Sequence, residues 1–599
     1  MLLERRQRPK SPPVAQTQTI PAPVGGLNAR DALPLMPPTD AVTLDNFFPS
    51  TTSVDLRSGY IKWSTGYPAA VETLMTWGGT TSSNAKLFAA SSTKIYDATS
   101  QGAVGASAVS GLTSARFQNV NFGTPGGQFL IAVNGSDFPL CYTGSEWRLY
   151  SSAAAQTIST ITHVTTTATL TTSAPHGLVT GNSVTISGTT PAAYSGTFLI
   201  TVTGASTFTY TMLSDPGANA GVVGTYTVFS ITGVDPRLFI HVNNYANRLF
   251  FVEKDSMRVW YLPLTSISGA ASVLDFSSLY SLGGYIVAMA TWTIDNAAGV
   301  NEYAIFISSE GEILMYNGTD PSVAANWVKV GRYRVGRPVG RRCFVRVSSD
   351  VIIICGDGFM PMSKAILTDR NQEDSLSNKI INLVNTAIDA YSGNFGWEAV
   401  YSPLRNKLIF NVPENENSLQ YQFVMNTLTG AWCRFTNWKA NCFQLLGDES
   451  FFGSNLESGA NSAYVAKCDY GYSDNGAYIF GEAKGAFNYL GSPGRKKQIT
   501  MVRPFFKTSG VIQASLGIDV DFGDNFPAAT PIFSGTTGTP WNTALWNTFP
   551  WATTPSTKAD WEGAQGIGDS ISLHMRVVNN KTALSWQAYQ FLYKVGGYL

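Results

Sequence analysis

Charged side chains are scarce in this chain of 599 residues. They make up 13% of it, against about a quarter in an average soluble domain. Forty basic residues balance forty acidic ones, so the formal net charge is zero. Such a protein has no overall attraction to nucleic acid or to an anionic membrane surface. Any site for a partner of that kind must therefore be local.

Cysteine is also rare, and its spacing excludes the common metal sites. The six cysteines are Cys141, Cys343, Cys355, Cys433, Cys442 and Cys468. They form no CxxC pair and no cysteine/histidine cluster with zinc-binding spacing. The pattern predicts buried free thiols in a protein that folds in a reducing cytoplasm.

Long apolar runs are missing as well. No stretch approaches the ~20 residues that span a bilayer as a helix, so no membrane insertion is predicted. The N-terminal sequence MLLERRQRPKSPP lacks the apolar region of a signal peptide. Residues 1–24 are basic and then rich in Pro, Gln and Thr, which predicts an extended N-terminal arm.

Residues for catalysis are few. The four histidines are His163, His176, His241 and His574. None lies in a nucleophile-elbow or metal-binding context. The glycines of CGDGF (355–359) lack the GxGxxG spacing and a following helix, which favours a hairpin turn.

One acidic group remains as a metal candidate. Asp519, Asp521 and Asp524 could hold Ca²⁺ through carboxylate oxygens. The neighbouring Gly517 and Gly523 favour a strand followed by a turn instead. The sequence therefore predicts no enzyme activity, no cofactor and no metal.

What the chain has in abundance is β-forming sequence with turns. Fifty-six glycines and many Ser, Thr, Asn, Tyr and Trp residues accompany repeated hairpin-like units, such as 128–150, 237–264 and 302–318. Repeated antiparallel units predict an irregular β-propeller of about six or seven blades. No WD dipeptide, kelch motif or Ser-x-Asp-x-Gly-x-x-Trp box assigns it to a named propeller class.

Two further β regions are predicted, and they set the expected domains. Residues 155–228 are rich in Thr, Ser and Val and almost uncharged, which predicts a small inserted β-barrel or sandwich module. The expected organisation is an arm (1–24), a first propeller part (25–154), the inserted module, the propeller remainder (229–470) and a C-terminal β domain (471–599). One helix is predicted at 374–391, capped by Asp374 or Ser375.

The pattern APHGL-TG-SVTISG, followed by YSGTF-ITV and STFTYT, resembles the small β-domain of ubiquitin-activating enzymes. Copies of that module are frequent in bacteriophage structural proteins. The resemblance implies a β module without ubiquitin chemistry.

Basic residues are concentrated at one place, 330–347. Its six arginines are Arg332, Arg334, Arg337, Arg341, Arg342 and Arg346. Two interpretations stay open: contacts to DNA phosphates without sequence readout, or ion pairs within or between subunits. We predict a channel-facing or interface position for this group.

The stretch 24–66, which we call the entry strap, is broken by Gly25-Gly26, Pro34, Pro37-Pro38, Pro49 and Gly59. Proline fixes φ and removes a donor, so an ordered ribbon is predicted rather than a helix or a regular strand. It precedes the first hairpin units.

The run GGLNARDALPLMPPTDAVTLDNFFPSTTSVDLRSGY resembles the N-terminal signature of nozzle, tail-tube and tail-stabilisation proteins of short-tailed bacteriophages (podoviruses). The matching positions are Gly26, Leu27, Asn28, Asp31, Pro38, Ala41, Leu44, Asn46, Pro49, Arg57 and Gly59.

The resemblance implies a virion structural protein that is assembled in the host cytoplasm. It would form a ring, usually a homo-hexamer, with a DNA channel and the strap on the head-proximal side. Implied partners are the adaptor (head-to-tail connector) protein, tail fibres or spikes, and genomic double-stranded DNA. The alternative is a receptor- or glycan-binding propeller, suggested by the loop residues Trp541, Trp546 and Trp551. Deletion of residues 1–24 is expected to weaken tail attachment more than folding.

Overall fold

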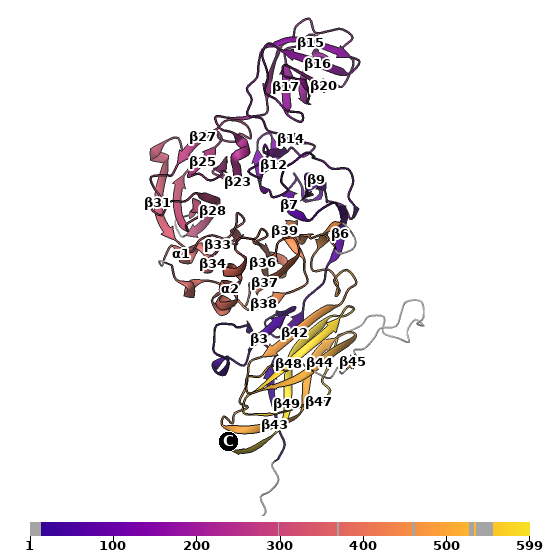
Figure 1. Cartoon of the computed structure of the whole chain (residues 1–599), viewed down its shortest axis with the longest axis vertical. Coiled ribbons are helices and arrows are strands. Elements are labelled where there is room, and N and C mark those ends of the chain that lie inside the picture. Colours follow the sequence, from indigo (N-terminus) through magenta and orange to yellow (C-terminus); the bar gives the residue numbers. More distant parts are fainter. Residues whose placement is uncertain are drawn as a thin grey trace, which may run out of the picture.

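The computed structural model describes residues 14–296, 299–367, 370–457, 462–525, 527, 532–534 and 555–598. Strands dominate it, as the composition predicted. Three parts follow one another along the long axis (Figure 1): a small inserted module at one end, a β-propeller in the middle and a β-sandwich at the other end.

The propeller has seven blades within the described residues, each an antiparallel sheet. The first four are β7 (Val71–Trp77), β8 (Lys86–Ser91) and β9 (Lys94–Asp97); β11 (Gln118–Thr124), β12 (Gly127–Val133), β13 (Leu140–Tyr142) and β14 (Trp147–Leu149); β23 (Phe239–Tyr245), β24 (Arg248–Glu253), β25 (Arg258–Tyr261) and β27 (Ser272–Asp275); and β28 (Ile286–Asn296), β29 (Gly299–Ser308), β30 (Glu312–Gly318) and β31 (Trp327–Arg334).

The last three blades are β32 (Phe344–Val347), β33 (Asp350–Cys355) and β34 (Gly358–Pro361); β35 (Glu398–Ser402), β36 (Lys407–Asn415), β37 (Leu419–Asn426) and β38 (Trp432–Phe435); and β39 (Ala440–Leu446), β40 (Glu449–Ser454), β41 (Ala463–Lys467) and β6 (Ile61–Tyr67). The first strand of each blade is innermost and contacts the next blade, and β39 contacts β7 to complete the circle.

The apolar cores lie between neighbouring blades. Phe88 of the first blade, for example, packs its ring against Tyr142 and Trp147 of the second, with ring centroids 4.7 and 5.0 Å apart. Separate clusters of this kind join the blades in succession. Since both faces of each sheet are covered, central strands such as β33 (DVIIIC) are apolar without alternation.

The ring closes through a strand from the N-terminal side. Strand β6 pairs antiparallel with β41 and becomes the outer strand of the seventh blade. Tyr60, just before β6, stacks on Tyr464 with a hydroxyl–hydroxyl distance of 3.0 Å. One blade is thus built from both ends of the propeller sequence.

The inserted module has its own core between two small sheets. Its strands are β15 (Ile158–Val164), β16 (Thr167–Thr172), β20 (Thr207–Thr211) and β19 (Thr201–Gly204) in one sheet, and β18 (Gly196–Leu199), β17 (Ser183–Ser187) and β21 (Thr225–Val228) in the other. Its two ends meet where Ser151 bridges Ser230. The propeller segments before and after the module are therefore adjacent in space.

The C-terminal β domain is a sandwich of two sheets. One contains β1 (Gln16–Pro21), β4 (Phe47–Pro49), β5 (Val54–Leu56), β43 (Arg495–Thr508), β46 (Ser556–Lys558), β47 (Glu562–Gly568) and β49 (Leu584–Tyr598). The other contains β2 (Gly26–Leu27), β3 (Asp40–Asp45), β42 (Ile479–Gly485), β44 (Val511–Val520), β45 (Ile532–Ser534) and β48 (Ile571–Asn579). Strand β3 also pairs with β38, which makes this second sheet continuous with the sixth blade.

The entry strap is ordered, but its expected place was wrong. The boundary at residue 25 assigned it to the propeller, whereas β2 to β5 lie in the sandwich and only β6 enters a blade. Part of the expected arm is also an edge strand, since β1 pairs with β49 and buries Ile20. Deleting residues 1–24 would therefore remove core packing too.

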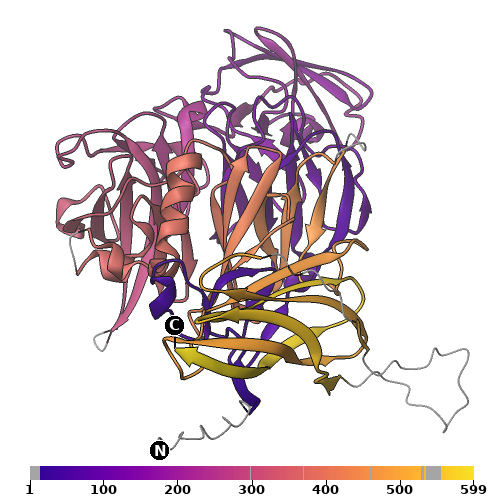
Figure 2. The same ribbon diagram turned by 60° about the horizontal axis from the view of Figure 1, so that its bottom comes forward.

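The predicted helix is shorter than 374–391. Helix α2 spans Ile381–Tyr391, preceded by 3₁₀ turns at Gln372–Asp374 and Asn378–Ile380. Ser375 and Ser377 do not cap it, because their hydroxyls bond the carbonyl and amide of Phe359 on β34. The helix (Figure 2) packs on β36 and β34, between two blades. A short helix, α1 (Met362–Ala365), follows β34.

Three other expectations can be placed. All six cysteines are free and buried, as predicted. In the described part of the chain, no helix combines the length and apolarity needed to cross a bilayer. Trp541, Trp546 and Trp551 lie outside the described residues.

A buried ion pair joins the strap to the turn before β42. The guanidinium of Arg57, with no exposed side-chain area, donates to both carboxylate oxygens of Asp474 at 2.7 and 2.6 Å. Its Nε donates to Asn46 Oδ1 at 2.8 Å, and the ring of Trp438 lies 5.2 Å away. The strap is therefore held by paired charge as well as by apolar packing.

Asp474→Asn should lower the free energy of unfolding by about 3–5 kcal/mol, because it leaves Arg57 buried without its counter-ion. The double variant Arg57→Met/Asp474→Leu should lose less, since both desolvated charges are gone. Urea unfolding followed by tryptophan fluorescence measures both. Arg337→Gln is the control, because that arginine is 76% exposed and its pair with Glu310 is worth at most about 1 kcal/mol. Equal losses in Asp474→Asn and the control would contradict this role.

Candidate functional site at the propeller axis

A cavity of about 360 Å³ runs along the propeller axis. Six of the seven innermost strands or the residues just before them line it; the lining side chains include Thr73, Phe117, His241, Arg342, Glu398 and Gln444. Polar groups meet here because the first strand of each blade turns one edge toward the axis. The propeller axis is therefore the candidate functional site.

Arg342 crosses the axis and connects four blades. It precedes the fifth blade, and its Nη1 donates to Glu398 of the sixth at 3.0 Å. Its Nη2 donates to Thr73 Oγ1 of the first blade at 2.7 Å and to the carbonyl of Phe117, next to the second, at 3.1 Å. The guanidinium thus divides the axial space into an inner cavity and a mouth.

Glu398 faces Arg342 from a largely buried position, with 18% of its side chain exposed. Burial raises the pKa of its carboxyl, and Arg342 together with the amide of Phe443 offsets only part of that rise. The pair is therefore a charged contact in a low-dielectric environment, where removal of one partner is strongly felt.

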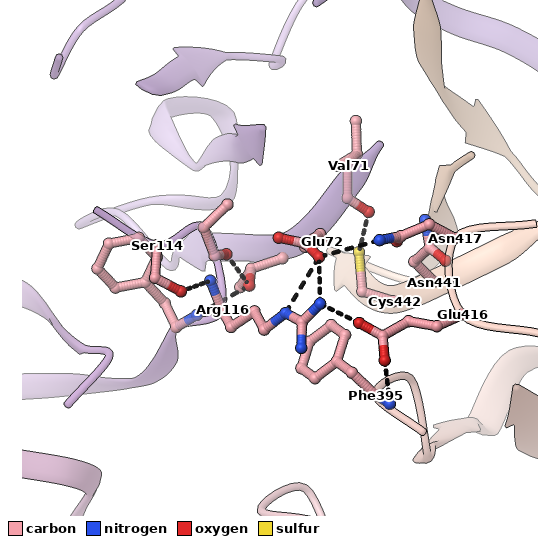
Figure 3. Close-up of polar contacts among 12 residues, drawn as sticks. Val71, Glu72, Ser114, Arg116, Phe395, Glu416, Asn417, Asn441 and Cys442 are labelled. Atoms are coloured by element: carbon pink, nitrogen blue, oxygen red, sulfur yellow. Dashed lines mark hydrogen bonds and ion pairs between the residues drawn. The ribbon is translucent and has the colours of Figure 1, made fainter. Parts of the chain in front are cut away.

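Arg116 makes a second charged cluster at the mouth (Figure 3). Its guanidinium lies between the carboxylates of Glu72 and Glu416, with Nη2 at 2.9 Å from Glu72 Oε1. Phe395 lies below it, with the ring centroid 4.2 Å from the guanidinium carbon. Burial lowers the pKa of Arg116, but the two carboxylates outweigh this and the net pKa is raised.

The mouth itself is a cavity of about 360 Å³, here called the axial mouth cavity. Its lining includes four basic residues: Arg116, Lys254, Arg341 and Arg342. They sit before the first strand of a blade or, for Lys254, between the second and third strands. Because neighbouring strands alternate in direction, both kinds of loop lie on the same face of the propeller.

Arg341 differs from its neighbours in having no carboxylate partner within ion-pair distance among the described residues. Its one hydrogen bond is a long one, from Nη1 to the carbonyl of Asn134 at 3.4 Å. Burial lowers the pKa of this guanidinium, and Asp255 offsets only part of the shift.

The six arginines of 330–347 do not form one band. Arg332 and Arg334 lie on β31, the outer strand of the fourth blade, and Arg337 pairs with Glu310 at 2.7 Å. Arg341, Arg342 and Arg346 lie at or next to the innermost strand of the fifth blade. The six arginines separate because the chain crosses a blade from rim to axis within this stretch. Their expected position at a channel or an interface stays a prediction.

The acidic group of the C-terminal domain is a turn around a lysine. Asp519, Asp524 and His574 lie close enough to hold a metal. Lys484 Nζ, however, lies 2.8 Å from Asp519 Oδ2 and 3.2 Å from Asp524 Oδ1. Asp521 instead accepts from the amides of Asp569 and Ser570. An ammonium group already occupies the place of a cation, which supports the strand-and-turn interpretation.

The histidines have structural contacts. His241 is buried on the axis against Phe344, and burial lowers its pKa to about 4, so it is neutral at physiological pH. His163 lies 2.7 Å from the hydroxyl of Tyr194 inside the inserted module. The prediction of no enzyme activity stays a prediction.

Sequence inspection missed Arg116, Lys254, Glu72 and Glu398. They come from four separate segments, and none stands in a motif. Only Arg341 and Arg342 fell within the basic stretch. Nothing local marks the others, since their common feature is a place on the ring axis.

No protein-family model matches this chain, and no curated protein matches it. Among solved structures, BBS1N in complex with ARL6DN matches 69% of this chain and 97% of its own, with 9% identity and a TM-score of 0.25. The Myceliophteria thermophila Cps50 (Swd1) β-propeller domain matches 69% and 99%, with 7% identity and a TM-score of 0.26. An exo-β-1,3-galactanase from Phanerochaete chrysosporium matches 77% and 99%, with 9% identity and a TM-score of 0.19. Scores this low carry no argument about function.

Arg342→Met should destabilise the protein by about 3–5 kcal/mol at neutral pH, because Glu398 is left buried without its partner. The pKa of Glu398, already raised by burial, should rise further. A carboxyl whose folded pKa exceeds its unfolded pKa supports folding at low pH and loses that contribution as pH rises through the folded pKa. The deficit against the native protein should therefore shrink between pH 8 and pH 5, measured as the difference in melting temperature.

Arg342→Met/Glu398→Leu is the matched control, since it removes the titrating group. Its deficit should not grow as the pH rises in that range, because the native protein alone still carries the titrating carboxyl. A pH-independent deficit in the single variant would contradict the role given to Glu398.

Proposed function

We propose that this protein is a virion structural protein of a short-tailed bacteriophage and forms the tail nozzle. In this role it assembles as a homo-hexameric ring below the adaptor protein, carries tail fibres or spikes, and retains and then conducts genomic double-stranded DNA. It performs no catalysis. The observation that supports this most is the entry strap, whose signature residues form the joint between the propeller and the sandwich.

The strap glycines allow a close approach of two backbones. Gly26 has a φ of +82°, and a Cβ there would lie 2.6 Å from the backbone of Trp432 in the sixth blade. A Cβ on Gly59 would lie 1.8 Å from the carbonyl oxygen of Ser473. A larger residue at Gly26 would push the strap away from the sixth blade, and one at Gly59 would push it away from the turn before β42.

The strap amides and carboxylates complete the joint. Asn28 donates to Asp40 Oδ2 at 2.7 Å, and Asp40 Oδ1 accepts from Lys379, just before α2, at 2.8 Å. Asn46 donates to the carbonyl of Phe480 at 2.7 Å and accepts from the amide of Thr436 at 2.9 Å. These residues of the resemblance thus all help to hold the strap at the joint between the propeller and the sandwich. A shared structural role of this kind favours a real relationship to the nozzle family over a chance match.

The axis of a single propeller cannot be the DNA conduit. Arg342 crosses it, and its cavities of about 360 Å³ are far too small for a duplex whose major groove alone is about 12 Å wide. A conduit must then form between subunits, through a heterologous interface that closes into a ring. Net zero charge suits such a passage, because strong phosphate binding would hold the DNA.

Exposed aromatic side chains beside the strap joint support an interface with further copies of the chain. Tyr470, Tyr472, Tyr478 and Phe480 are 52%, 44%, 54% and 54% exposed. Aromatic residues are enriched at protein interfaces and are otherwise costly to leave in water. Tyr478, just before β42, and Phe480 on β42 flank the buried Ile479, and both are exposed.

The purified protein, alone or with its adaptor protein, should have the mass of a hexamer by native mass spectrometry. Tyr478→Asp/Phe480→Asp should reduce it to a monomer with an unchanged melting temperature. Leu213→Asp in the inserted module, at a fully exposed leucine, should leave the ring intact. A native protein that stays monomeric both alone and with its adaptor would refute the proposal.

A further inference from the structure

The axial mouth cavity presents cationic groups that the protein itself leaves unpaired. Arg341 has its single long hydrogen bond to Asn134, and Lys254 forms no ion pair with any described residue. A guanidinium offers five donors in a fixed planar fork. Most of the donors of Arg341 therefore have no partner among the described residues.

The carboxylates that balance the other two arginines lie behind the cavity wall. Glu72 and Glu416 hold Arg116, and Glu398 holds Arg342, but none of the three acids lines the cavity. The wall that a ligand would touch is therefore basic. The acids behind it balance much of that charge, which favours a singly charged ligand over a doubly charged one.

Neutral polar groups complete the wall. The side chains of Gln118, Ser136 and Ser392 line the same cavity and make no hydrogen bond to another described residue. Their amide and hydroxyl groups can both donate and accept, as the hydroxyls of a polyol require. The cavity volume of about 360 Å³ lies in the range of small-molecule sites, about 300–1,000 Å³.

We propose that the axial mouth cavity binds a small hydroxylated carboxylate of the sugar-acid class, with Arg341 holding the carboxylate. The guanidinium fork of Arg341 pairs with both carboxylate oxygens, a geometry that Arg forms readily. Lys254 adds a second positive charge, and Gln118, Ser136 and Ser392 bond the ligand hydroxyls. Arg341 is exposed at the cavity surface, so its remaining donors are open to a ligand that enters from solvent. The site is independent of ring formation.

Isothermal titration of the full-length protein with D-glucuronate, glucose and glucose 6-phosphate tests this inference. Glucuronate should bind with 1:1 stoichiometry per chain, glucose should show no binding, and glucose 6-phosphate should bind more weakly than glucuronate. Arg341→Gln should weaken glucuronate binding about tenfold or more, as expected for loss of a charge-assisted hydrogen-bonded contact. Arg341 makes only one long hydrogen bond to the described residues, so this variant should keep the native melting temperature.

Arg337→Gln is the matched control, because it removes an arginine of the same stretch that faces solvent outside the cavity. It should bind glucuronate like the native protein. No heat of binding at millimolar glucuronate, equal binding of glucose, or unchanged affinity in Arg341→Gln would overturn the proposal. Tighter binding of glucose 6-phosphate would overturn the carboxylate assignment. Each of these outcomes is readable whether the protein is a monomer or a ring.

Discussion

Pairing of β6 with β41 is the constraint on which the rest of the structure depends. It joins strands from opposite ends of the propeller sequence and gives the first and last blades a common core, which includes Leu74 and Val465. The entropic cost of closing a loop rises only logarithmically with chain length. Closing this long segment therefore costs little more free energy than closing a short one. Without this pairing, both blades would expose apolar faces and a sheet edge to water.

The same N-terminal segment also connects the propeller to the sandwich. On its way to β6 it contributes β2 and β3 to one sheet of the sandwich, and β4 and β5 to the other. The buried pair of Arg57 and Asp474 lies where these sheets and the closing blade meet. A buried ion pair seldom adds stability over apolar packing, but it disfavours any arrangement that separates its partners. We therefore infer that the ion pair fixes the position of the sandwich relative to the propeller.

Two neighbouring arginines at the propeller axis differ in how fully they are paired. Arg342 has partners in three other blades, whereas its neighbour Arg341 has almost none. Several of the few charged residues in this chain are held in pairs of the first kind, including Lys407 with Asp469, both buried, and the buried Lys497 with the half-buried Asp569. Arg341, by contrast, is exposed on the cavity wall with no carboxylate partner among the described residues, which leaves its guanidinium available to a ligand.

Sequence by itself determined the strand-rich character, the repeated hairpins, the separate Thr-rich module at 155–228 and the burial of the six thiols. These depend on turn residues and apolar patterning within a few positions, which act locally. Tertiary structure alone decided that the strap belongs to the sandwich, that α2 begins at Ile381 because Ser375 and Ser377 bond to β34, and that the arginines of 330–347 separate. It also brought Arg116, Lys254 and Arg341 to one mouth. The reason is physical: pairing of distant strands and stacking of blades set which loops share the axis, and no local pattern records that order.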